Sequence, residues 1–529
     1  MTLHSVCDLI SMKYDHIDCV FGPGRTLVKV LLINPKISLD LSRSATCPLG
    51  LLSIASFLNA KGHTAVIFDG MVETGSAKKK IRGFNPDVVG ISLISPMAGR
   101  DALRISRYAK KLNKPVVWGG HFISTFPELA LQEGCVDYVV IGEGEITFSE
   151  LLDALQSGSP AENINGLAYK DGSRVRITGQ RAFADLSTFP VIDWSLVKPE
   201  KYFQYFFGVK KMIYVYFSKG CPGKCTFCIN PTFQRSTHRR RPAEHIIAEI
   251  EYLIKHCGID SVNFADEYWH PGKEEMQRFF DLIEQKQLKF SWGVQTRLGS
   301  LDRGDLQKMY NAGCRWILFG IESGRKERNR QIKKGVDLDK AKEIFAACRE
   351  IGLTTQSSFI IGFPGETEEE LKESVRFGLS LNANLCPFSM LFLQPGTEMY
   401  NDAVAKGLYK PPETLKAWSK IVWLEKLNVN LSNVPDRELK VIHHYTQWSA
   451  FADKGSINND SYGIAKKMIS DAFIKIFRNG PLYVIPGAIA SAKWFFTVLW
   501  YAKAYPGIVK KYGLHERSVP GQCAADSRE

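Results

Sequence analysis

Three cysteines stand within eight positions of the stretch SKGCPGKCTFCIN, residues 218 to 230. Cys221, Cys225 and Cys228 can converge on one point because the glycine and proline residues around them allow the backbone to fold tightly. Structural zinc sites use four ligands, and the nearest further candidate, His238, lies ten residues beyond the third cysteine. Three thiolates suit an iron–sulfur cluster that leaves one iron open, so the spacing C-x3-C-x2-C favours a cluster over a zinc ion.

The composition indicates a globular enzyme-sized chain. Its 529 residues, of which 45% are hydrophobic and 23% charged, predict two or three domains with ordinary cores. The net charge of +13 suits an anionic partner, but the basic residues are scattered and select no particular one. Charged residues interrupt Met1 to Gly22, so no secretory leader is expected, and twelve cysteines then favour a reducing, cytoplasmic environment.

The first part of the chain has the rhythm of a parallel sheet. From Val28 to Gly158, short apolar runs alternate with amphipathic segments, which predicts five parallel strands flanked by helices. Such sheets bind ligands beyond the carboxyl ends of their strands. The residues expected at this edge are Ser92, Ser95, Gly119, Gly120, His121, Gly142 and Glu143.

A second alternation follows a connector that contains a predicted hairpin at Asp171-Gly172. Six apolar runs between Met212 and Leu393 are separated by helical segments. Six strand–helix units are too few for a closed eightfold barrel and predict an open, partial (β/α)6 barrel. The cysteines follow the first of these strands, at the end of a barrel where chemistry takes place.

The cysteine motif, with Phe227 as its aromatic residue, resembles the signature of the radical S-adenosylmethionine (SAM) superfamily, C-x3-C-x-aromatic-C. The resemblance continues through NFADEYW, VQTRL, GIESG, FIIGFPGET and LQPGTEMY. These segments recur in the branch with an amino-terminal cobalamin-binding domain, and CPLGLLSIASFLNAKGH is similar to part of that domain. The similarity covers Val28 to Tyr400.

The resemblance implies three cofactors, namely a [4Fe–4S] cluster, SAM and cobalamin. It implies that Cys221, Cys225 and Cys228 hold three irons while the fourth iron chelates SAM. The further SAM contacts that it implies are Phe227 at the adenine, Asp266 or Glu267 at the ammonium, Gln295 or Arg297 at the carboxylate, Glu322 at the ribose, and Ser323, Gly362 and Pro364 beside them.

The histidines depart from one pattern of cobalamin binding. Domains that replace the cofactor's own base use an Asp-x-His-x-x-Gly loop, and none of the eleven histidines lies in such a loop. The resemblance therefore implies cobalamin held without a lower histidine ligand. His121 is the one histidine near the predicted cofactor edge.

Five segments are expected along the chain. They are an amino-terminal extension (1–27), a Rossmann-like cobalamin-binding domain (28–160), a connector (161–210), the partial barrel (211–400) and a mainly helical carboxyl-terminal region (401–529).

Residues 481–502 are almost long enough to span a membrane. Lys493 at their centre disfavours a span, since a central lysine costs about 3 kcal/mol. Flanking lysines with Trp494 and Trp500 suit a helix at an anionic lipid surface, such as the inner face of the membrane, and a buried helix that closes the barrel is the alternative. Either role implies a large or hydrophobic substrate.

We expect methyl transfer to an unactivated carbon of a bulky, lipid-like or tetrapyrrole substrate. Such a carbon is too weakly acidic to attack a sulfonium methyl, whereas radical hydrogen abstraction makes it reactive toward methylcobalamin. The resemblance implies an electron donor such as flavodoxin or ferredoxin.

Three alternatives remain open. One is a cyclase of the same branch that forms a carbon–carbon bond, and another is a non-enzymatic cobalamin or iron–sulfur carrier or sensor. The third, a tRNA methylthiotransferase, is disfavoured because Cys7, Cys19 and Cys47 are too widely spread for a second cysteine trio, so nucleic acid is not expected as a partner.

The cysteine assignment predicts a simple loss of iron. Anaerobically reconstituted protein should bind about four irons, and changing Cys221, Cys225 and Cys228 to alanine should abolish this. Iron content and visible absorption measure the cluster. Replacing Cys135, Cys257 or Cys314, which are expected to pack in the core, should leave it intact. A triple variant that keeps its iron would contradict the assignment.

Overall fold

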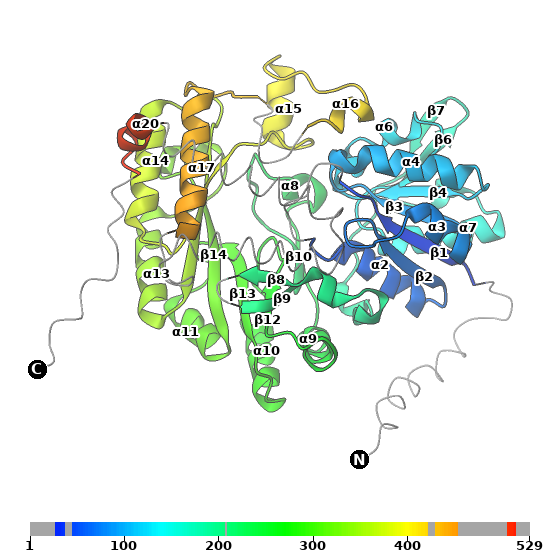
Figure 1. The fold of residues 1–529 in the computed structure, drawn as a ribbon, viewed down its shortest axis with the longest axis horizontal. Helices are drawn as coiled ribbons and strands as arrows, with labels where there is room; N and C mark the ends of the chain where they lie inside the picture. The colour runs from blue at the N-terminus through cyan, green and yellow to red at the C-terminus, as the bar shows by residue number, and fades with distance from the viewer. Residues whose placement is uncertain (1–26, 38–44, 207–208, 422–428, 453–504, 515–529) are drawn as a thin grey trace, which may run out of the picture.

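The computed structural model describes residues 27–37, 45–206, 209–421, 429–452 and 505–514. Residues 1–26 and the apolar segment 481–502 lie outside these ranges. Figure 1 shows two α/β units side by side, the first coloured blue to cyan and the second mainly green.

The first unit is built on a seven-stranded sheet in the order β2-β1-β3-β4-β5-β6-β7. The five strands predicted from the apolar runs are parallel, which confirms the Rossmann-like arrangement. They are β1 (Lys29–Asn34), β2 (Thr64–Asp69), β3 (Val88–Ser92), β4 (Val116–Gly119) and β5 (Tyr138–Val140). The antiparallel hairpin of β6 (Leu167–Asp171) and β7 (Arg174–Ile177) extends the sheet, turning at the predicted Asp171-Gly172.

Helices cover both faces of this sheet because its strands carry apolar side chains on both sides. The helices α2 (Leu49–Ala60) and α7 (Glu145–Ser157) bury Leu52 and Leu151 in one core. The opposite face packs against α3 (Ala77–Phe84), α4 (Gly99–Lys110), α5 (His121–Thr125) and α6 (Pro127–Leu131).

The second unit has six parallel strands in chain order, as predicted for an open barrel. They are β9 (Val209–Val215), β12 (Ser261–Phe264), β13 (Ser291–Arg297), β14 (Cys314–Glu322), β15 (Thr354–Ile361) and β16 (Phe388–Met390). The short strand β8 (Gln204–Phe206) pairs antiparallel with β9. The edge strands of this sheet, β8 and β16, do not pair with each other, so the barrel is open.

Helices cover the outer side of this curled sheet (Figure 1). They are α9 (Ala243–Cys257), α10 (Lys273–Gln285), α11 (Arg303–Asn311), α13 (Leu338–Ile351) and α14 (Glu368–Ser380), while the short α12 (Lys326–Gln331) leads to Ile332, whose carbonyl accepts from Thr226 of the cysteine loop. The predicted apolar face of α9 is buried, and Gly258 ends this helix in the left-handed conformation with φ of 62°.

The described carboxyl-terminal residues are mainly helical and contact both units. The helices in this part of the chain are α15 (Glu398–Ala405), α16 (Leu415–Trp418), α17 (Asp436–Ala452) and α20 (Pro506–Lys511). Trp418 of α16 packs against Phe122 of the first unit, with ring centroids 5.3 Å apart. The helix α17 packs along β16 of the barrel. No helix in the described ranges is long and apolar enough to cross a membrane.

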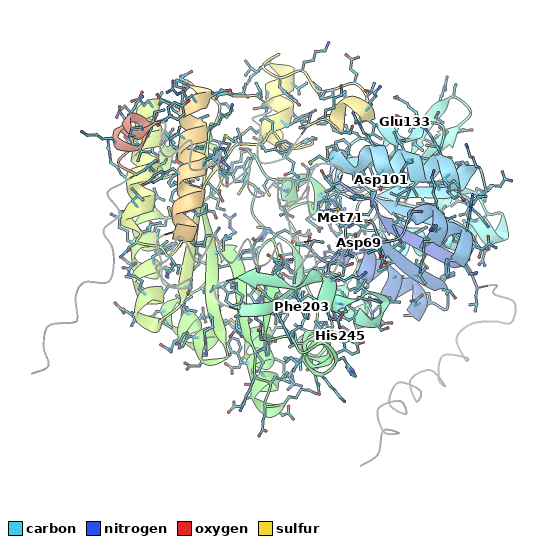
Figure 2. The ribbon with its side chains drawn as sticks, viewed as in Figure 1. Asp69, Met71, Asp101, Glu133, Phe203 and His245 are labelled. Carbon is cyan, nitrogen blue, oxygen red and sulfur yellow. The ribbon has the colours of Figure 1, made fainter. Side chains whose placement is uncertain are left out.

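The connector joins the two units into one hydrophobic core. Asp69, at the end of β2, accepts a hydrogen bond of 2.9 Å from the hydroxyl of Tyr202, and Figure 2 shows Asp69 where the units meet. Trp194 is buried and donates to Glu249 of α9. Because side chains of both sheets belong to one cluster of buried residues, the connector packs as part of the core.

Candidate active site

A cavity of about 250 Å³ lies between the carboxyl edge of the first sheet and the mouth of the barrel. Most of the expected cofactor residues of the first unit line it, namely Ser92, Gly119, Gly120, His121, Gly142 and Glu143. The barrel contributes Ser218, Lys219, Ala265 and Glu267. Residues that lie far apart in the sequence therefore meet around one space, as expected for a cofactor held between two domains.

The inner part of this cavity extends between the first sheet and the helices α2 and α7. Leu32, Gly90, Val117 and Phe148 line it, so this part is apolar. Gly120 has φ of 107°, and a Cβ atom there would lie 2.9 Å from the carbonyl carbon of Leu93. A side chain at this position would strain the backbone that forms the rim. The apolar slot and its glycine rim suit an apolar part of a bulky cofactor such as cobalamin.

Two expected residues of this edge have different surroundings. Ser95 accepts a hydrogen bond of 3.4 Å from the backbone amide of Met97 and so caps the short helix Pro96–Ala98. His121 lines the cavity, and its ring centroid lies 4.1 Å from that of Phe233. Burial lowers the pKa of His121, although the nearby Glu143 carboxylate acts in the opposite direction. The imidazole is therefore neutral at pH 7.

The loop GEGE carries two acidic residues that bind basic residues of the barrel unit. Glu143, expected to contact the cofactor, accepts hydrogen bonds of 2.5 and 3.0 Å from the guanidinium of Arg239. Glu145 accepts hydrogen bonds from Lys219, at 2.7 Å, and from Ser53, at 2.6 Å. Both ion pairs therefore connect the first unit to residues on either side of the cysteine loop, in the barrel unit.

Glu145 is buried, and its charge is balanced by a single ammonium group. Burial alone would raise the pKa of this carboxyl, but the charge and hydrogen bond of Lys219 hold the pKa below its ordinary value. Burial by itself would lower the pKa of Lys219, but the attraction of Glu145, Tyr216 and Glu143 and the hydrogen bond to Glu145 together raise it. The sequence did not single out Glu145 or Lys219, since neither belongs to a recognised ligand pattern.

The cysteine loop begins directly after Lys219. The short strand β10 (Ser218–Gly220) pairs antiparallel with β11 (His238–Arg240) and brings the chain into the barrel mouth. Gly220 has φ of 87°, and a Cβ atom there would lie 2.3 Å from the carbonyl oxygen of Thr237. Glycine is therefore required where the loop turns toward the cysteines.

The three thiols of the loop lie near one another. Cys221 and Cys225 are buried and Cys228 is partly exposed. Burial raises the pKa of Cys228, and the neighbouring sulfurs of Cys225 and Cys221 raise it further. Donors already face these sulfurs, because the backbone amide of Gly223 lies 3.4 Å from the sulfur of Cys221 and the side-chain amide of Asn230 lies 3.8 Å from that of Cys228.

Within the described ranges, no group of three or more acidic, histidine or cysteine side chains converges closely enough to hold a single metal ion. Thiolates around a four-iron cluster are spaced more widely than the ligands of one ion, because each binds a different iron. The donor set of three thiols with N–H groups beside them fits such a cluster.

Arg297, at the end of β13, reaches the cysteine loop. Its Nη1 lies 3.6 Å from the sulfur of Cys225, and its Nη2 donates to the carbonyl of Lys334. Burial would lower the pKa of Arg297, but the neighbouring sulfurs raise it. Gln295, two residues earlier, accepts a hydrogen bond from the backbone amide of Trp269 through its own carbonyl. Of the two expected carboxylate contacts, Arg297 lies at the cluster loop.

The neighbouring acids Asp266 and Glu267 have different environments. Asp266 is fully buried and accepts hydrogen bonds from the backbone amides of Phe217 and Ser218. Burial raises its pKa to about 7 against the effect of these hydrogen bonds. Glu267 lines the cofactor cavity and accepts one hydrogen bond of 3.1 Å from the amide of Gly220. Of these two acids, Glu267 lines the cavity and Asp266 does not.

Glu322 and Ser323 follow β14 on the far side of the barrel mouth. Glu322 has φ of 71°, which is strained for a residue other than glycine, and its carboxylate pairs with Lys334 at 2.8 Å. Ser323 is buried, and its hydroxyl contacts that of Ser374 at 3.2 Å. Ser323 therefore connects the loop after β14 to α14 through Ser374.

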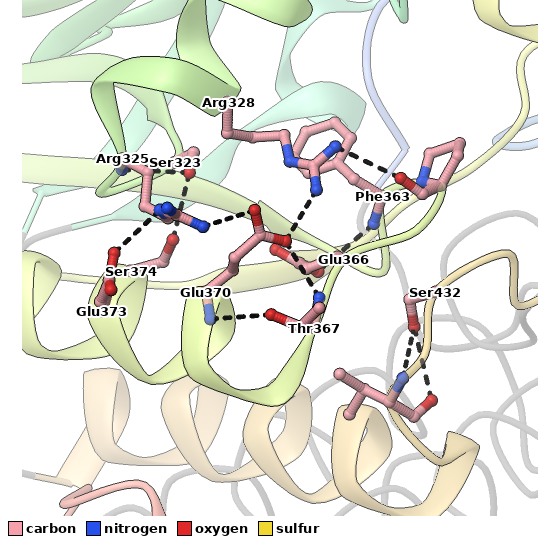
Figure 3. A network of polar contacts seen from close by, with 12 residues as sticks. Ser323, Arg325, Arg328, Phe363, Glu366, Thr367, Glu370, Glu373, Ser374 and Ser432 are labelled. Atoms are coloured by element: carbon pink, nitrogen blue, oxygen red, sulfur yellow. Dashed lines mark hydrogen bonds and ion pairs between the residues drawn. The ribbon is translucent and has the colours of Figure 1, made fainter.

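The loop FPGE, residues 363–366, is held in place by its own glutamate. Glu366 accepts hydrogen bonds from the amides of Gly362, at 2.6 Å, and Phe363, at 3.3 Å. Figure 3 shows Arg328 beside it, donating to the carbonyl of Pro364 and to Glu370. Gly362 and Pro364 thus contribute backbone groups to a rigid loop.

Phe227 connects the cysteine motif to the FPGE loop. Its ring packs against that of Phe363, with centroids 6.2 Å apart. Phe363 is fully buried, so this contact places the aromatic residue of the cysteine motif on a fixed support.

Comparison with known proteins agrees with this arrangement. The radical SAM superfamily model matches residues 215–378, and the B12 binding domain model matches residues 36–152. The uncharacterized methyltransferase PH0819 of Pyrococcus horikoshii is 32% identical over 394 residues, covering 72% of this chain and 84% of that protein. The chain belongs to the cobalamin-binding radical SAM enzymes.

Two further similarities extend the comparison. The anaerobic magnesium-protoporphyrin IX monomethyl ester cyclase of Rubrivivax gelatinosus is 27% identical, covering 67% of this chain and 66% of the cyclase. The solved structure of the methyltransferase TsrM from Kitasatospora setae, with cobalamin and a [4Fe–4S] cluster bound, superposes with a TM-score of 0.62. It shares 19% identity and covers 73% of this chain and 80% of its own.

These findings establish the cofactors of the enzyme. It is a radical SAM enzyme that uses a [4Fe–4S] cluster, SAM and cobalamin. Its relatives include methyltransferases, as expected from the sequence.

The ion pair of Glu145 and Lys219 should stabilise the folded protein. Changing Glu145 to alanine removes the nearer carboxylate of Lys219, at 2.7 Å, and leaves that of Glu143 at 3.9 Å, so the free energy of unfolding should fall by about 3 kcal/mol. Urea denaturation measures this loss.

A matched control separates this effect from that of an ordinary surface charge. Glu350 forms an exposed pair with Arg303, so Glu350→Ala should cost less than about 1 kcal/mol. Equal, small losses in both variants would show that the Glu145 pair does not stabilise the join between the units.

Proposed function

We propose that this enzyme transfers a methyl group to an unactivated carbon of a bulky substrate. The observation that carries the proposal is the single cavity lined both by the cobalamin-side residues and by Glu267 of the barrel. When bound, the cluster and SAM supply radical hydrogen abstraction, and cobalamin supplies the methyl group. A reaction of this kind requires the two cofactors to face one substrate, and the cavity lies where their domains meet.

We assign roles to the chain's own residues from their surroundings. Cys221, Cys225 and Cys228 hold the cluster, and the guanidinium of Arg297 offsets the negative charge of the thiolates. Glu267 binds the ammonium of SAM, because it lines the cavity and its carboxylate accepts one backbone amide, whereas that of the fully buried Asp266 accepts two.

The remaining expected residues shape the same site. Phe227 supports the adenine, and Glu322 offers its carboxylate to the ribose while Lys334 holds it in place. Gly362 and Pro364 form the wall of the SAM site at the loop 363–366. On the cobalamin side, Ser92 and the backbone of Gly119, Gly120 and Gly142 border the cofactor, and neutral His121 lies beside it without ligating cobalt.

The organisation of the chain follows from these roles. We assign cobalamin binding to residues 28–160 and SAM cleavage to residues 211–400, with 161–210 as the connector and 401–529 as a region that shapes the substrate side. The electron required for SAM cleavage comes from a small reductant such as flavodoxin or ferredoxin.

A tetrapyrrole is the first substrate class to test. The relative from Rubrivivax gelatinosus is named for a cyclase reaction on a magnesium-protoporphyrin ester, so ring formation on a similar substrate is the second candidate function. Both reactions begin with hydrogen abstraction, and product mass distinguishes an added methyl group from a new ring.

The neighbouring acids provide a test of SAM binding. Changing Glu267 to glutamine removes a charged partner of the ammonium, so the affinity of the reconstituted enzyme for SAM should fall about tenfold. Equilibrium dialysis with labelled SAM measures the affinity, and 5′-deoxyadenosine formation measures cleavage.

Asp266→Asn is the matched control in this experiment. It should lower stability, because Asp266 accepts backbone hydrogen bonds, while SAM affinity per folded molecule stays unchanged. Unchanged SAM affinity in Glu267→Gln would remove this residue from the site. Absence of 5′-deoxyadenosine from the reduced, fully loaded wild type would contradict the proposed reaction.

We also propose that residues 481–502 contact an anionic membrane surface. The apolar face supplies hydrophobic binding, and each flanking lysine adds about 1 kcal/mol near anionic lipid. Full-length protein should therefore sediment with phosphatidylserine-containing vesicles, less strongly in high salt, whereas a chain that ends at Asn479 should not. Equal binding by both chains, or none by either, would assign the segment to the alternative of a buried helix.

A further inference from the structure

A second cavity, of about 390 Å³, adjoins the cofactor cavity on the other side of the GEGE loop. The two cavities share Gly142, Glu143, Glu145 and Phe233 as walls. The connector from Ile177 to Phe189 forms one side of the second cavity, and α8 (Asn230–Phe233) forms another. A ligand in this space would therefore lie next to the place where the cofactors meet.

The lining of the second cavity is mostly apolar. Its larger apolar side chains are Ile141, Ile146, Ile177, Phe183, Phe189 and Ile229. Charged residues interrupt this surface, namely Arg181 and Arg235 together with Glu143 and Glu145, whose carboxylates are paired with Arg239 and Lys219. Arg181 is paired with Glu150, so its charge is already balanced.

Arg235 has no such balance. Its guanidinium lies 3.8 Å from the ring centroid of Phe183 and donates one hydrogen bond of 2.6 Å to the carbonyl of Arg181. Its Nε is buried, and in the part of the chain that the structure describes this atom has no hydrogen-bond partner. No carboxylate within the described ranges pairs with Arg235, although the nearby Arg239 is paired with Glu143. A cation in an apolar wall without a counter-charge favours an anionic ligand.

The backbone at Arg235 is also unusual. Arg235 and Ser236 both have positive φ, of 50° and 52°, a left-handed conformation that costs energy in residues other than glycine. Strain of this kind persists where surrounding structure enforces it, and it concentrates at ligand sites. Here it occurs in the turn that follows α8 and carries Arg235 into the wall of the cavity.

We propose that the second cavity binds the acidic end of the substrate, an organic carboxylate with an apolar body, and that Arg235 receives the carboxylate. The apolar walls accommodate the body, and the shared GEGE loop leads from this cavity to the cofactors. The proposal names the substrate class of the enzyme and so rests on the proposed function. Cobalamin also carries an anionic group, its phosphate, and the experiment separates the two sources.

The test uses reconstituted full-length protein loaded with cobalamin, and two fluorescent probes of similar shape. 1-Pyrenebutyrate carries a carboxylate, and 1-pyrenebutanol replaces it with a neutral hydroxyl. The wild type should bind the acid about tenfold more tightly than the alcohol. Arg235→Gln should remove this preference by weakening only the acid, and Arg235→Lys should retain part of it because the charge remains.

Arg303→Gln is the matched control, since Arg303 lies exposed on α11, and it should keep the full preference. Equal binding of acid and alcohol by the wild type, or an unchanged preference in Arg235→Gln, would overturn the proposal. Loss of cobalamin binding in Arg235→Gln would overturn it too, because the arginine would then serve the cofactor. The binding measurement needs no turnover, so a wild type that prefers the acid but makes no 5′-deoxyadenosine would support this site and contradict the proposed reaction instead.

Discussion

The buried ion pair of Glu145 and Lys219 is the contact on which the active site depends. Its carboxylate begins α7 at the cobalamin edge, and its ammonium lies two residues before Cys221. A buried charge that loses its partner is costly, so a shift of either unit at this point would separate the two charges and leave the buried carboxylate of Glu145 without its nearest cation. The pair thus fixes the position of the cysteine loop relative to the cobalamin edge.

Other contacts reinforce the same placement. Arg239 and Glu143 form a second pair across the join, and β10 and β11 connect this pair to the first through their hydrogen-bonded ladder. Asp266 adds hydrogen bonds at the start of β10. The loop that carries the cysteines is therefore held at its amino-terminal end by the cobalamin-binding unit as well as by the barrel.

Much of this architecture could be predicted from the sequence because its signals are local. Apolar runs at strand length gave both parallel sheets, and Gly258 marked the end of α9. The spacing of the cysteines alone predicts which loop holds the cluster, and the radical SAM family model matches the segment that contains this loop. Asp266 and Glu267 could not be told apart, because adjacent residues share their sequence context and only the fold decides that Asp266 is buried while Glu267 lines the cavity.

The contacts across the join could not be predicted at all. Glu145 and Lys219 are separated by 74 residues, and an acid after a strand has the same local pattern whether it pairs across a domain boundary or faces water. The role of Arg235 was equally hidden, since its surroundings come from the connector and from α8. Such pairings depend on tertiary packing. They leave no periodic pattern and no characteristic spacing in a single sequence, so they could not be predicted from it.

The shared hydrophobic core has a consequence for how the enzyme handles its substrate. Cobalamin-side residues such as Leu52 and barrel residues such as Ile250 belong to one continuous buried cluster, joined through Trp194 of the connector. Opening the two units like a hinge would expose that cluster to water, at a free-energy cost proportional to the apolar area uncovered. A substrate therefore has to reach the cavity while the two units stay joined, through motions of side chains and loops that leave this cluster buried.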